Sequence, residues 1–277
     1  MHNATLLQND GVSIPVDFLP DRQLASPSIP FLSLALKKMK TFLSVVAVLS
    51  LFASMPAQAH YLWSENTVKG NTIYFGGVDE NVREVSPGRL DEFANLSARV
   101  QHMNGAISAR ALQKTHDGFT SIAPIAADES LIGQDLSIPV KDMSAYQLGI
   151  LKLNFYVRHV QIDHPFPATL DLDAVPTGMP GQFRFTFKGT PLVNFKAKLI
   201  APNGWITEVR TDASGLLNIA TPWRGNYVIE ATSFENLSGE FQGQKFERIR
   251  HRLGLTVVQP KGSQTFAPDY TTHEHAD

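Results

Sequence analysis

The histidine at position 60 is the residue best placed for metal chemistry, because a cleavable segment precedes it directly. Residues 56–59 read PAQA, the small-residue pattern that signal peptidase cuts, and cleavage after Ala59 makes His60 the N-terminal residue. Its free α-amino group, with an ordinary pKa of about 8, then lies beside its imidazole. These two nitrogens and one further imidazole form a three-nitrogen set that suits Cu(II) or Ni(II). The alternative is structural: His60 opens a strand in which Tyr61 and Trp63 pack inward, and cleavage at a neighbouring bond removes the chelate.

Three further histidines are candidate partners for His60. His159 and His164 flank the end of an expected strand, with Asp163 between them, and they converge only if the chain turns at 162–165. In the segment ERIRHRL the period of two places His251 on the inward face of a strand. That position predicts either a hydrogen-bonded core histidine or a ligand that faces a cavity. The predicted metal ligands are therefore His60, His159, His164 and His251.

The same period of two places three arginines on the other face of that strand. We expect Arg248, Arg250 and Arg252 to form a solvated face that pairs with nearby carboxylates. The candidate carboxylates are Glu235, Glu240 and Glu247. The alternative interpretation of the three arginines is an anion site.

Two other clusters contain groups that bind cations. The C-terminal THEHAD combines His273 and His275 with acidic residues, which suits either loose binding of divalent metals or a disordered, solubilising terminus. Carboxylates also gather in a segment of loop character, at Asp79, Glu80, Glu84, Asp91 and Glu92. They could supply oxygen ligands to a hard cation, although the D-x-D-x-D-G spacing of a calcium loop is absent.

The elements that must position these side chains are β-strands. The alternation in QFRFTF places Phe183, Phe185 and Phe187 on one face of a strand. The turn signals PNG and DASG then separate further alternating segments. Short strands with turn signals at regular spacing over 182–259 predict an antiparallel sandwich.

The first half of the chain is less regular. Strands are expected at 72–75, 106–112 and 148–160, and a short helix or an ordered loop at 87–98. The predicted fold class is all-β, with two antiparallel β-sandwich-like domains. The predicted segments are a leader or mis-assigned upstream start at 1–38, a signal peptide at 39–59, an N-terminal β domain at 60–169, a linker at 170–181, a C-terminal β-sandwich at 182–259 and a polar tail at 260–277.

Composition excludes several classes of protein and favours an exported one. Lys37, Lys38 and Lys40 precede an apolar run, the layout of a secretory signal peptide, which predicts export to a bacterial periplasm. The chain of 277 residues has no cysteine, which excludes a disulfide scaffold and thiolate metal sites. Its formal net charge of −2 provides no electrostatic footprint for nucleic acid. No other apolar stretch approaches the roughly 20 residues that span a bilayer, so no membrane-spanning segment is expected after cleavage.

Two stretches of sequence carry a resemblance to known families. GTPLVNFKAKLIAPNGW, with the later TDASGLLNIATPWRGNYVIEA, resembles transthyretin-like (carboxypeptidase-regulatory-like) sandwich modules of immunoglobulin-like fold. Most of residues 60–259, opening HYLW directly after AQA, is similar to a bacterial periplasmic family whose members are often labelled as nickel- or cobalt-uptake accessory components. The resemblance implies an exported two-domain β protein with a metal role, with a membrane transporter component as partner, and it brings no catalytic residues.

These observations favour a binding protein over an enzyme, because the G-x-S-x-G, H-E-x-x-H and P-loop motifs are missing. The first hypothesis is a periplasmic protein that captures or presents a nickel, cobalt or copper ion through His60, for uptake or homeostasis. The second is an immunoglobulin-like interaction module without metal, which binds a protein or glycan through Trp63, Trp205 and Trp223. A third, a copper oxygenase with the same N-terminal chelate, requires an exposed flat or grooved site.

Overall fold

The computed structural model describes residues 60–266 and 268–273, and these residues form β-strands and two short 3-10 helices. No α-helix occurs in this part of the chain. The predicted all-β fold class is therefore confirmed. The leader predicted at 1–38 and the signal peptide predicted at 39–59 lie outside the described residues.

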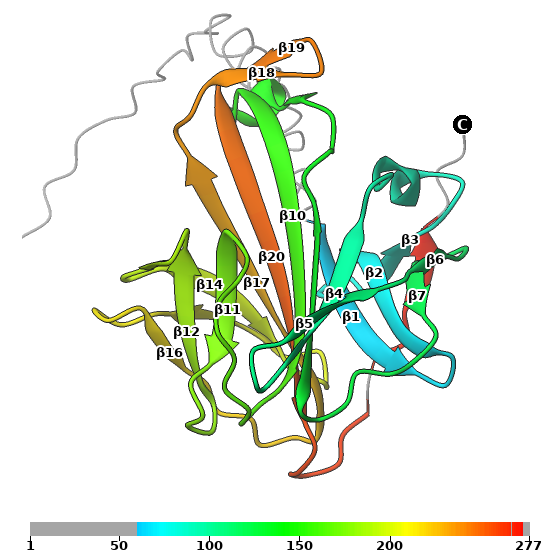
Figure 1. The fold of residues 1–277 in the computed structure, drawn as a ribbon, viewed down its shortest axis with the longest axis vertical. Helices are drawn as coiled ribbons and strands as arrows, with labels where there is room; N and C mark the ends of the chain where they lie inside the picture. Colours follow the sequence, from blue (N-terminus) through cyan, green and yellow to red (C-terminus); the bar gives the residue numbers. More distant parts are fainter. Residues whose placement is uncertain (1–59, 267, 274–277) are drawn as a thin grey trace, which may run out of the picture. The chain divides into compact units, whose positions relative to one another are not determined.

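The largest sheet has nine strands and draws them from both halves of the chain. In spatial order they are β15 (Ile206–Arg210), β14 (Lys196–Ile200), β17 (Gly225–Glu235), β20 (Arg248–Gln259), β10 (Ile150–Gln161), β8 (Glu129–Asp135), β4 (Ser97–His102) and β5 (Ile107–Arg110), with β9 (Lys141–Asp142) beside β10. The two long strands β10 and β20 run side by side in parallel, in register from Leu151↔Arg248 to Gln161↔Val258 (Figure 1). The two predicted halves are therefore joined by main-chain hydrogen bonds within one sheet.

Three smaller sheets accompany it. The six-stranded sheet contains β21 (Thr271–His273), β3 (Val82–Glu84), β2 (Gly70–Gly77), β7 (Phe119–Ser121) and β6 (Gln113–Lys114), with β1 (Tyr61–Thr67) on β2. The four-stranded sheet contains β11 (Leu172–Pro176), β12 (Gln182–Phe187) and β13 (Thr190–Pro191), with β16 (Leu216–Asn218) on β12. A hairpin pairs β18 (Gly239–Phe241) with β19 (Gln244–Phe246), and the 3-10 helices are η1 (Arg89–Glu92) and η2 (Ser144–Tyr146).

Strand β20 shows that the nine-stranded sheet is covered on both faces. Leu253 points to one face, where it belongs to a core with Phe183 and Phe185 of the four-stranded sheet. Gly254 points to the other face, where a Cβ would lie 1.8 Å from the backbone oxygen of Leu62. Only glycine therefore allows β1 to cross so close to β20. Strands β1 and β2 lie on one side of β10 and β20, and β11 and β12 lie on the other (Figure 1).

A second core fills the interface on the β1 side. Phe75 of β2, Phe93 after η1 and Phe155 of β10 pack edge to face, with ring centroids 4.6 to 5.7 Å apart. Such edge contacts place the positive rim of one ring against the negative face of the next. This aromatic cluster fixes β2 and the chain around η1 against the nine-stranded sheet.

The local patterns of the second half are found as predicted. The QFRFTF segment is β12, with Phe183 and Phe185 fully buried and Phe187 packed against the same core. In the predicted DASG turn, Asp212 Oδ1 accepts hydrogen bonds from the backbone N–H of Ser214 at 2.7 Å and of Leu216 at 2.9 Å. These turn and strand predictions are confirmed.

Two predicted segments differ from the structure. The linker predicted at 170–181 contains β11, all five residues of which are buried. Its composition of Pro, Gly and Asp is typical of a loop, but the short run LDAVP pairs with β12. The polar tail predicted at 260–277 contains β21, which pairs in parallel with β3.

Candidate functional site

His60 is the first described residue, and it lies buried directly before β1. Its carbonyl oxygen accepts a hydrogen bond from Arg252 Nη1 of β20 at 2.6 Å. Its imidazole meets the ring of Phe75 edge to face, with centroids 5.5 Å apart. The backbone and the ring of His60 are thus both held by the core between β1 and the nine-stranded sheet.

The Nδ1 side of the imidazole faces one carboxylate and one guanidinium group. His60 Nδ1 lies 2.9 Å from Glu84 Oε1 and 2.6 Å from Arg89 Nη1, and Arg89 Nη1 lies 3.0 Å from the same oxygen. Nδ1 accepts from Arg89 when the ring proton is on Nε2, and it donates to Glu84 Oε1 when the proton is on Nδ1. In the first tautomer, the guanidinium group of Arg89 is the cation that lies against both the Nδ1 lone pair and the carboxylate oxygen.

The Nε2 side of the imidazole has a different environment. His60 Nε2 is buried and has no hydrogen-bond partner among the described residues. The nearest carboxylate oxygen, Glu80 Oε2, lies 3.8 Å away. With the proton on Nε2, the ring directs its positive edge toward Glu80 and its lone pair toward Glu84.

The turn and the strand that directly follow β2 position the carboxylates of Glu80 and Glu84 near His60. Glu80 lies in the turn that joins β2 to β3, where its N–H donates to Gly77 O at 3.3 Å. Glu84 is the last residue of β3 and is buried, whereas Arg89 opens η1 with 29% of its side chain exposed. The sequence predicted that carboxylates of this stretch could bind a cation. It contained no signal that two of them would meet His60.

The remaining carboxylates of that stretch pair with basic side chains. Asp79 contacts Lys198, Asp91 contacts Lys114, and Glu92 contacts Lys141 and Arg89. Glu80 and Glu84 are therefore the two carboxylates of this stretch that face the imidazole of His60.

Two of the other predicted ligands are core histidines. His159 Nδ1 lies 3.1 Å from both the hydroxyl and the carbonyl oxygen of Ser64, and burial lowers the pKa of His159 to about 4. His251 Nδ1 lies 2.9 Å from the Tyr156 hydroxyl, and its Nε2 lies 3.2 Å from Glu235 Oε2. Burial also lowers the pKa of His251, against the opposing effect of Glu235. Hydrogen bonds within the protein thus engage both rings.

The structure does not bring the four predicted ligands together. His251 points to the face of β20 that carries the Phe183 core, opposite the face on which β1 and His60 lie. His159 faces β1 at Ser64, four residues beyond His60, and His164 contacts the carbonyl oxygen of Ala127 and the carboxylate of Asp163. Strand geometry separates them because four residues of extended chain span about 13 Å.

A nickel or cobalt ion, as the resemblance implies, or a copper ion, which a three-nitrogen set suits, would find a different donor set from the one predicted. Among residues 60–266 and 268–273, no group of three or more His, Cys, Asp or Glu side chains is arranged to hold a metal ion. Two donors lie together, His60 Nδ1 and Glu84 Oε1, whereas Glu80 faces Nε2 on the other side of the ring. His273, predicted as a tail ligand, lies in register with Glu84 in the β21–β3 pair. His275 lies outside the described residues.

The arginines of β20 correct another prediction. Arg250 and Arg252 are 9% and 6% exposed, and no carboxylate of the described chain lies within 4.0 Å of either guanidinium group. Arg252 lies over the ring of Tyr61, and burial lowers its pKa, as it does for Arg250. The face expected to be solvated is buried at Arg250 and Arg252, where β1 crosses it, whereas Arg248 is half-buried and donates to the carbonyl oxygen of Leu148 at 2.6 Å. Glu235, one expected partner, pairs with Lys188 and His251 instead.

The tryptophans proposed for recognition differ in exposure. Trp63 is fully buried, and its Nε1 donates to Glu65 Oε1 at 2.9 Å, so it presents no surface to a partner. Trp205 is 54% exposed and meets Trp223 edge to face, with ring centroids 6.5 Å apart. Of the three tryptophans, only Trp205 and Trp223 reach the surface.

Comparison of the chain with protein-family models, with curated proteins and with solved structures gave no match. The resemblance to nickel- and cobalt-uptake components therefore stays a prediction. Within the described part of the chain, no helix is both long enough and apolar enough to cross a membrane.

Proposed function

We propose that this chain is an exported binding protein, rather than an enzyme, that captures or presents a nickel, cobalt or copper ion. His60 is the anchor ligand through its Nδ1 and through the α-amino group that cleavage after Ala59 releases. Glu84 supplies the carboxylate. The observation that carries this proposal is the 2.9 Å separation of His60 Nδ1 and Glu84 Oε1, with a cationic nitrogen against both atoms.

The spacing of the two donors supports the proposal. Nitrogen and oxygen ligands bind such ions at about 2.1 Å, so neighbouring donors at a right angle lie about 3 Å apart. His60 Nδ1 and Glu84 Oε1 have this separation without any rearrangement of their own. The chelating amine belongs to the main chain, which explains why side-chain groupings alone do not reveal a site.

A metal ion that binds here must displace the guanidinium group of Arg89 from His60 Nδ1 and Glu84 Oε1. The Arg89 side chain is 29% exposed, so the guanidinium group can move into solvent without crossing the core. Its neighbour Glu92 lies 3.8 Å from Arg89 Nε and offers the displaced charge a partner. Loss of a neutralising arginine beside two ligands is expected to strengthen cation binding.

Calorimetric titration of the protein that begins at His60 tests the proposal with Cu(II), Ni(II) and Co(II). Glu84→Gln keeps the shape of the side chain and removes its charge, and it should weaken binding at least about ten-fold. Arg89→Gln should tighten binding. The matched control is Glu129→Gln, because Glu129 also lies beside a histidine and an arginine, His102 and Arg110. Equal affinity of wild type and Glu84→Gln would overturn the proposal.

A second candidate is an interaction module that binds a glycan or protein without metal. The exposed side chain of Trp205, which contacts Trp223 edge to face, favours this second candidate, because exposed aromatic rings provide stacking surfaces. Titration with short hexose and N-acetylhexosamine oligosaccharides, followed by tryptophan fluorescence, tests this candidate. A saturable change that Trp205→Ala abolishes and that chelators do not affect would support the module over the metal carrier.

A further inference from the structure

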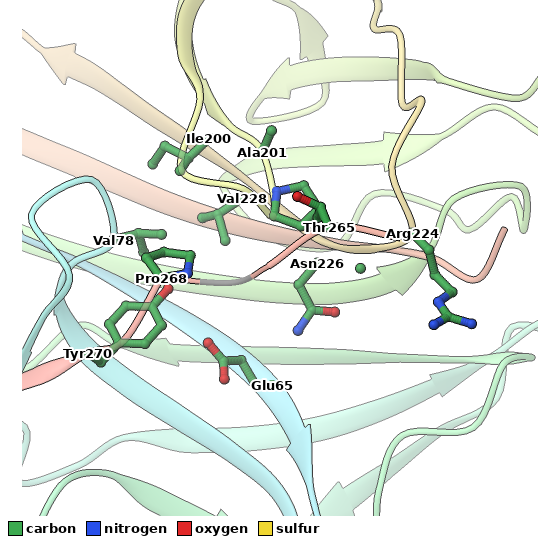
Figure 2. A pocket seen from close by; sticks show the side chains of 12 residues that line it. Glu65, Val78, Ile200, Ala201, Arg224, Asn226, Val228, Thr265, Pro268 and Tyr270 are labelled. Carbon is green, nitrogen blue, oxygen red and sulfur yellow. The ribbon is translucent and has the colours of Figure 1, made fainter. Parts of the chain in front are cut away.

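A cavity of about 270 Å³ lies beside β1 at Glu65. It is bordered by the β2–β3 turn at Val78, the end of β14 at Ile200, the start of β17 at Asn226, and the C-terminal segment at Thr265 and Tyr270 (Figure 2). The cavity is therefore built from parts of the chain that are distant in sequence and shares no lining residue with the His60 site.

One wall of the cavity is apolar. Val78, Ile200 and Val228 line it, and these three buried residues form a cluster with Trp63 and Tyr74 behind them. The three side chains are only 3–5% exposed, so a ligand that fits against them gains mainly dispersion contacts. An apolar body suits this wall because it leaves no polar group without a partner.

The acidic residue of the lining is already neutralised. Glu65 accepts from Trp63 Nε1 at 2.9 Å and from Arg83 Nη2 at 3.1 Å. Arg83 is itself held between the rings of Tyr74 and Tyr270, 3.7 and 4.3 Å from their centroids. The carboxylate of Glu65 thus adds little net charge to the cavity, but it stays fixed as a hydrogen-bond acceptor.

Arg224 gives the cavity its charge. It lies at the end of the cavity away from Tyr270 (Figure 2), and its side chain is exposed. Its backbone N–H donates to Ser263 O at 3.0 Å, whereas its guanidinium group has no ion pair or hydrogen bond with any residue of 60–266 or 268–273. The position of the backbone is therefore fixed, and the positive charge is available to a ligand.

We propose that this cavity binds a small organic carboxylate with an apolar body. The carboxylate pairs with Arg224, whose planar fork of donors matches two carboxylate oxygens. The body lies on Val78, Ile200 and Val228, and the amide of Asn226 can hydrogen-bond a polar substituent. The volume is just below the 300 to 1,000 Å³ of typical ligand pockets, which selects a metabolite-sized molecule. The site is independent of metal at His60.

Amide NMR spectra of the full mature chain titrated with hexanoate test the proposal. Saturable shifts of the Asn226 and Val228 amides are expected, and hexanamide, which has the same body without the charge, should bind at least about ten-fold more weakly. Arg224→Gln should weaken hexanoate to the level of hexanamide. The control is Arg184→Gln, because Arg184 is exposed on β12 and does not line the cavity.

Three results would overturn the proposal: no saturable shift with hexanoate, equal binding of hexanoate and hexanamide, or shifts confined to residues outside the lining. Val228→Trp provides a second variant, since a larger side chain fills the cavity without removing any charge. Its unchanged far-UV circular dichroism would show that it folds, and unaltered hexanoate binding in that folded variant would also contradict the proposal.

Discussion

Arg158 and Asp173 form a two-pronged ion pair that is completely buried between β10 and β11. Arg158 Nε donates to Asp173 Oδ1 and Nη2 donates to Oδ2, each at 2.7 Å, and neither side chain is exposed. The same carboxylate accepts the backbone N–H groups of Thr169, Leu170 and Ala174. Because both ionised groups are removed from water, each depends on the other for its stabilisation.

Removing one partner of this pair should destabilise the fold strongly. Asp173→Asn leaves the charge of Arg158 buried and unpaired, and we expect the free energy of unfolding to fall by about 3–5 kcal/mol. Urea denaturation measures it. The control is Glu208→Gln, which removes a solvent-exposed partner of Lys196 and should leave the midpoint unchanged. A wild-type midpoint for Asp173→Asn would contradict the prediction.

Truncating Phe185 should create a cavity in the core between β12 and β20. The side chain is fully buried, so Phe185→Ala is expected to cost roughly 3–5 kcal/mol. Thermal and urea unfolding of the mature chain test this. Phe266→Ala is the matched control, because Phe266 is almost fully exposed. Similar losses in the two variants would mean that the strand register of β12 is wrong.

Burial of His159 should make stability depend on pH. Its pKa falls from an unfolded value near 6.5 to about 4 in the folded state, so the unfolded chain binds the extra proton first. The stabilisation is complete above pH 6.5 and is lost as the pH falls toward 4, by on the order of 3 kcal/mol. His159→Gln should therefore flatten the pH profile of the urea midpoint in that window. The control is His116→Gln, an exposed histidine, and equal slopes in wild type and His159→Gln would refute the prediction.

Extending the N-terminus by one glycine should weaken Cu(II) binding although every histidine is retained. The added residue converts the α-amino group of His60 into an amide, which binds a metal only after a costly loss of its proton. Visible absorption titrations of the native and extended proteins compare them. Equal affinity would eliminate the terminal chelate while leaving the imidazole of His60 and the carboxylate of Glu84 as candidates.

Local sequence patterns predicted the strands and turns, but they could not predict which distant strands pair. The alternation of Phe183 and Phe185 and the turn at Asp212 depend on residues close in sequence, so the sequence alone could predict them. Nothing local reveals that β10 pairs with β20. The arginines of β20 alternate with apolar residues as on a surface strand, and only the crossing of β1 buries them.

The candidate site was predicted in part for the same reason. His60 was found because its position after a cleavage signal is a local feature. Its partners Glu84 and Arg89 are brought to it by the β2–β3 hairpin and η1, whose packing depends on the Phe75–Phe93–Phe155 cluster. The predicted partner His251 is a core histidine, a role that its alternation with apolar residues also allowed, and His159, predicted at a strand end, is buried as well.

The parallel pairing of β10 with β20 determines when the protein can fold. The N–H of Ile150 donates to the carboxylate of Glu247, 97 positions later in the chain, where the pairing begins. During synthesis, β10 therefore emerges with one edge unpaired and waits until β20 has left the ribosome. Such long-range pairings close slowly, and an unpaired central strand invites aggregation. A chain that stops before Arg248 thus stays an incomplete folding unit, because the edge of β10 that pairs with β20 has no partner.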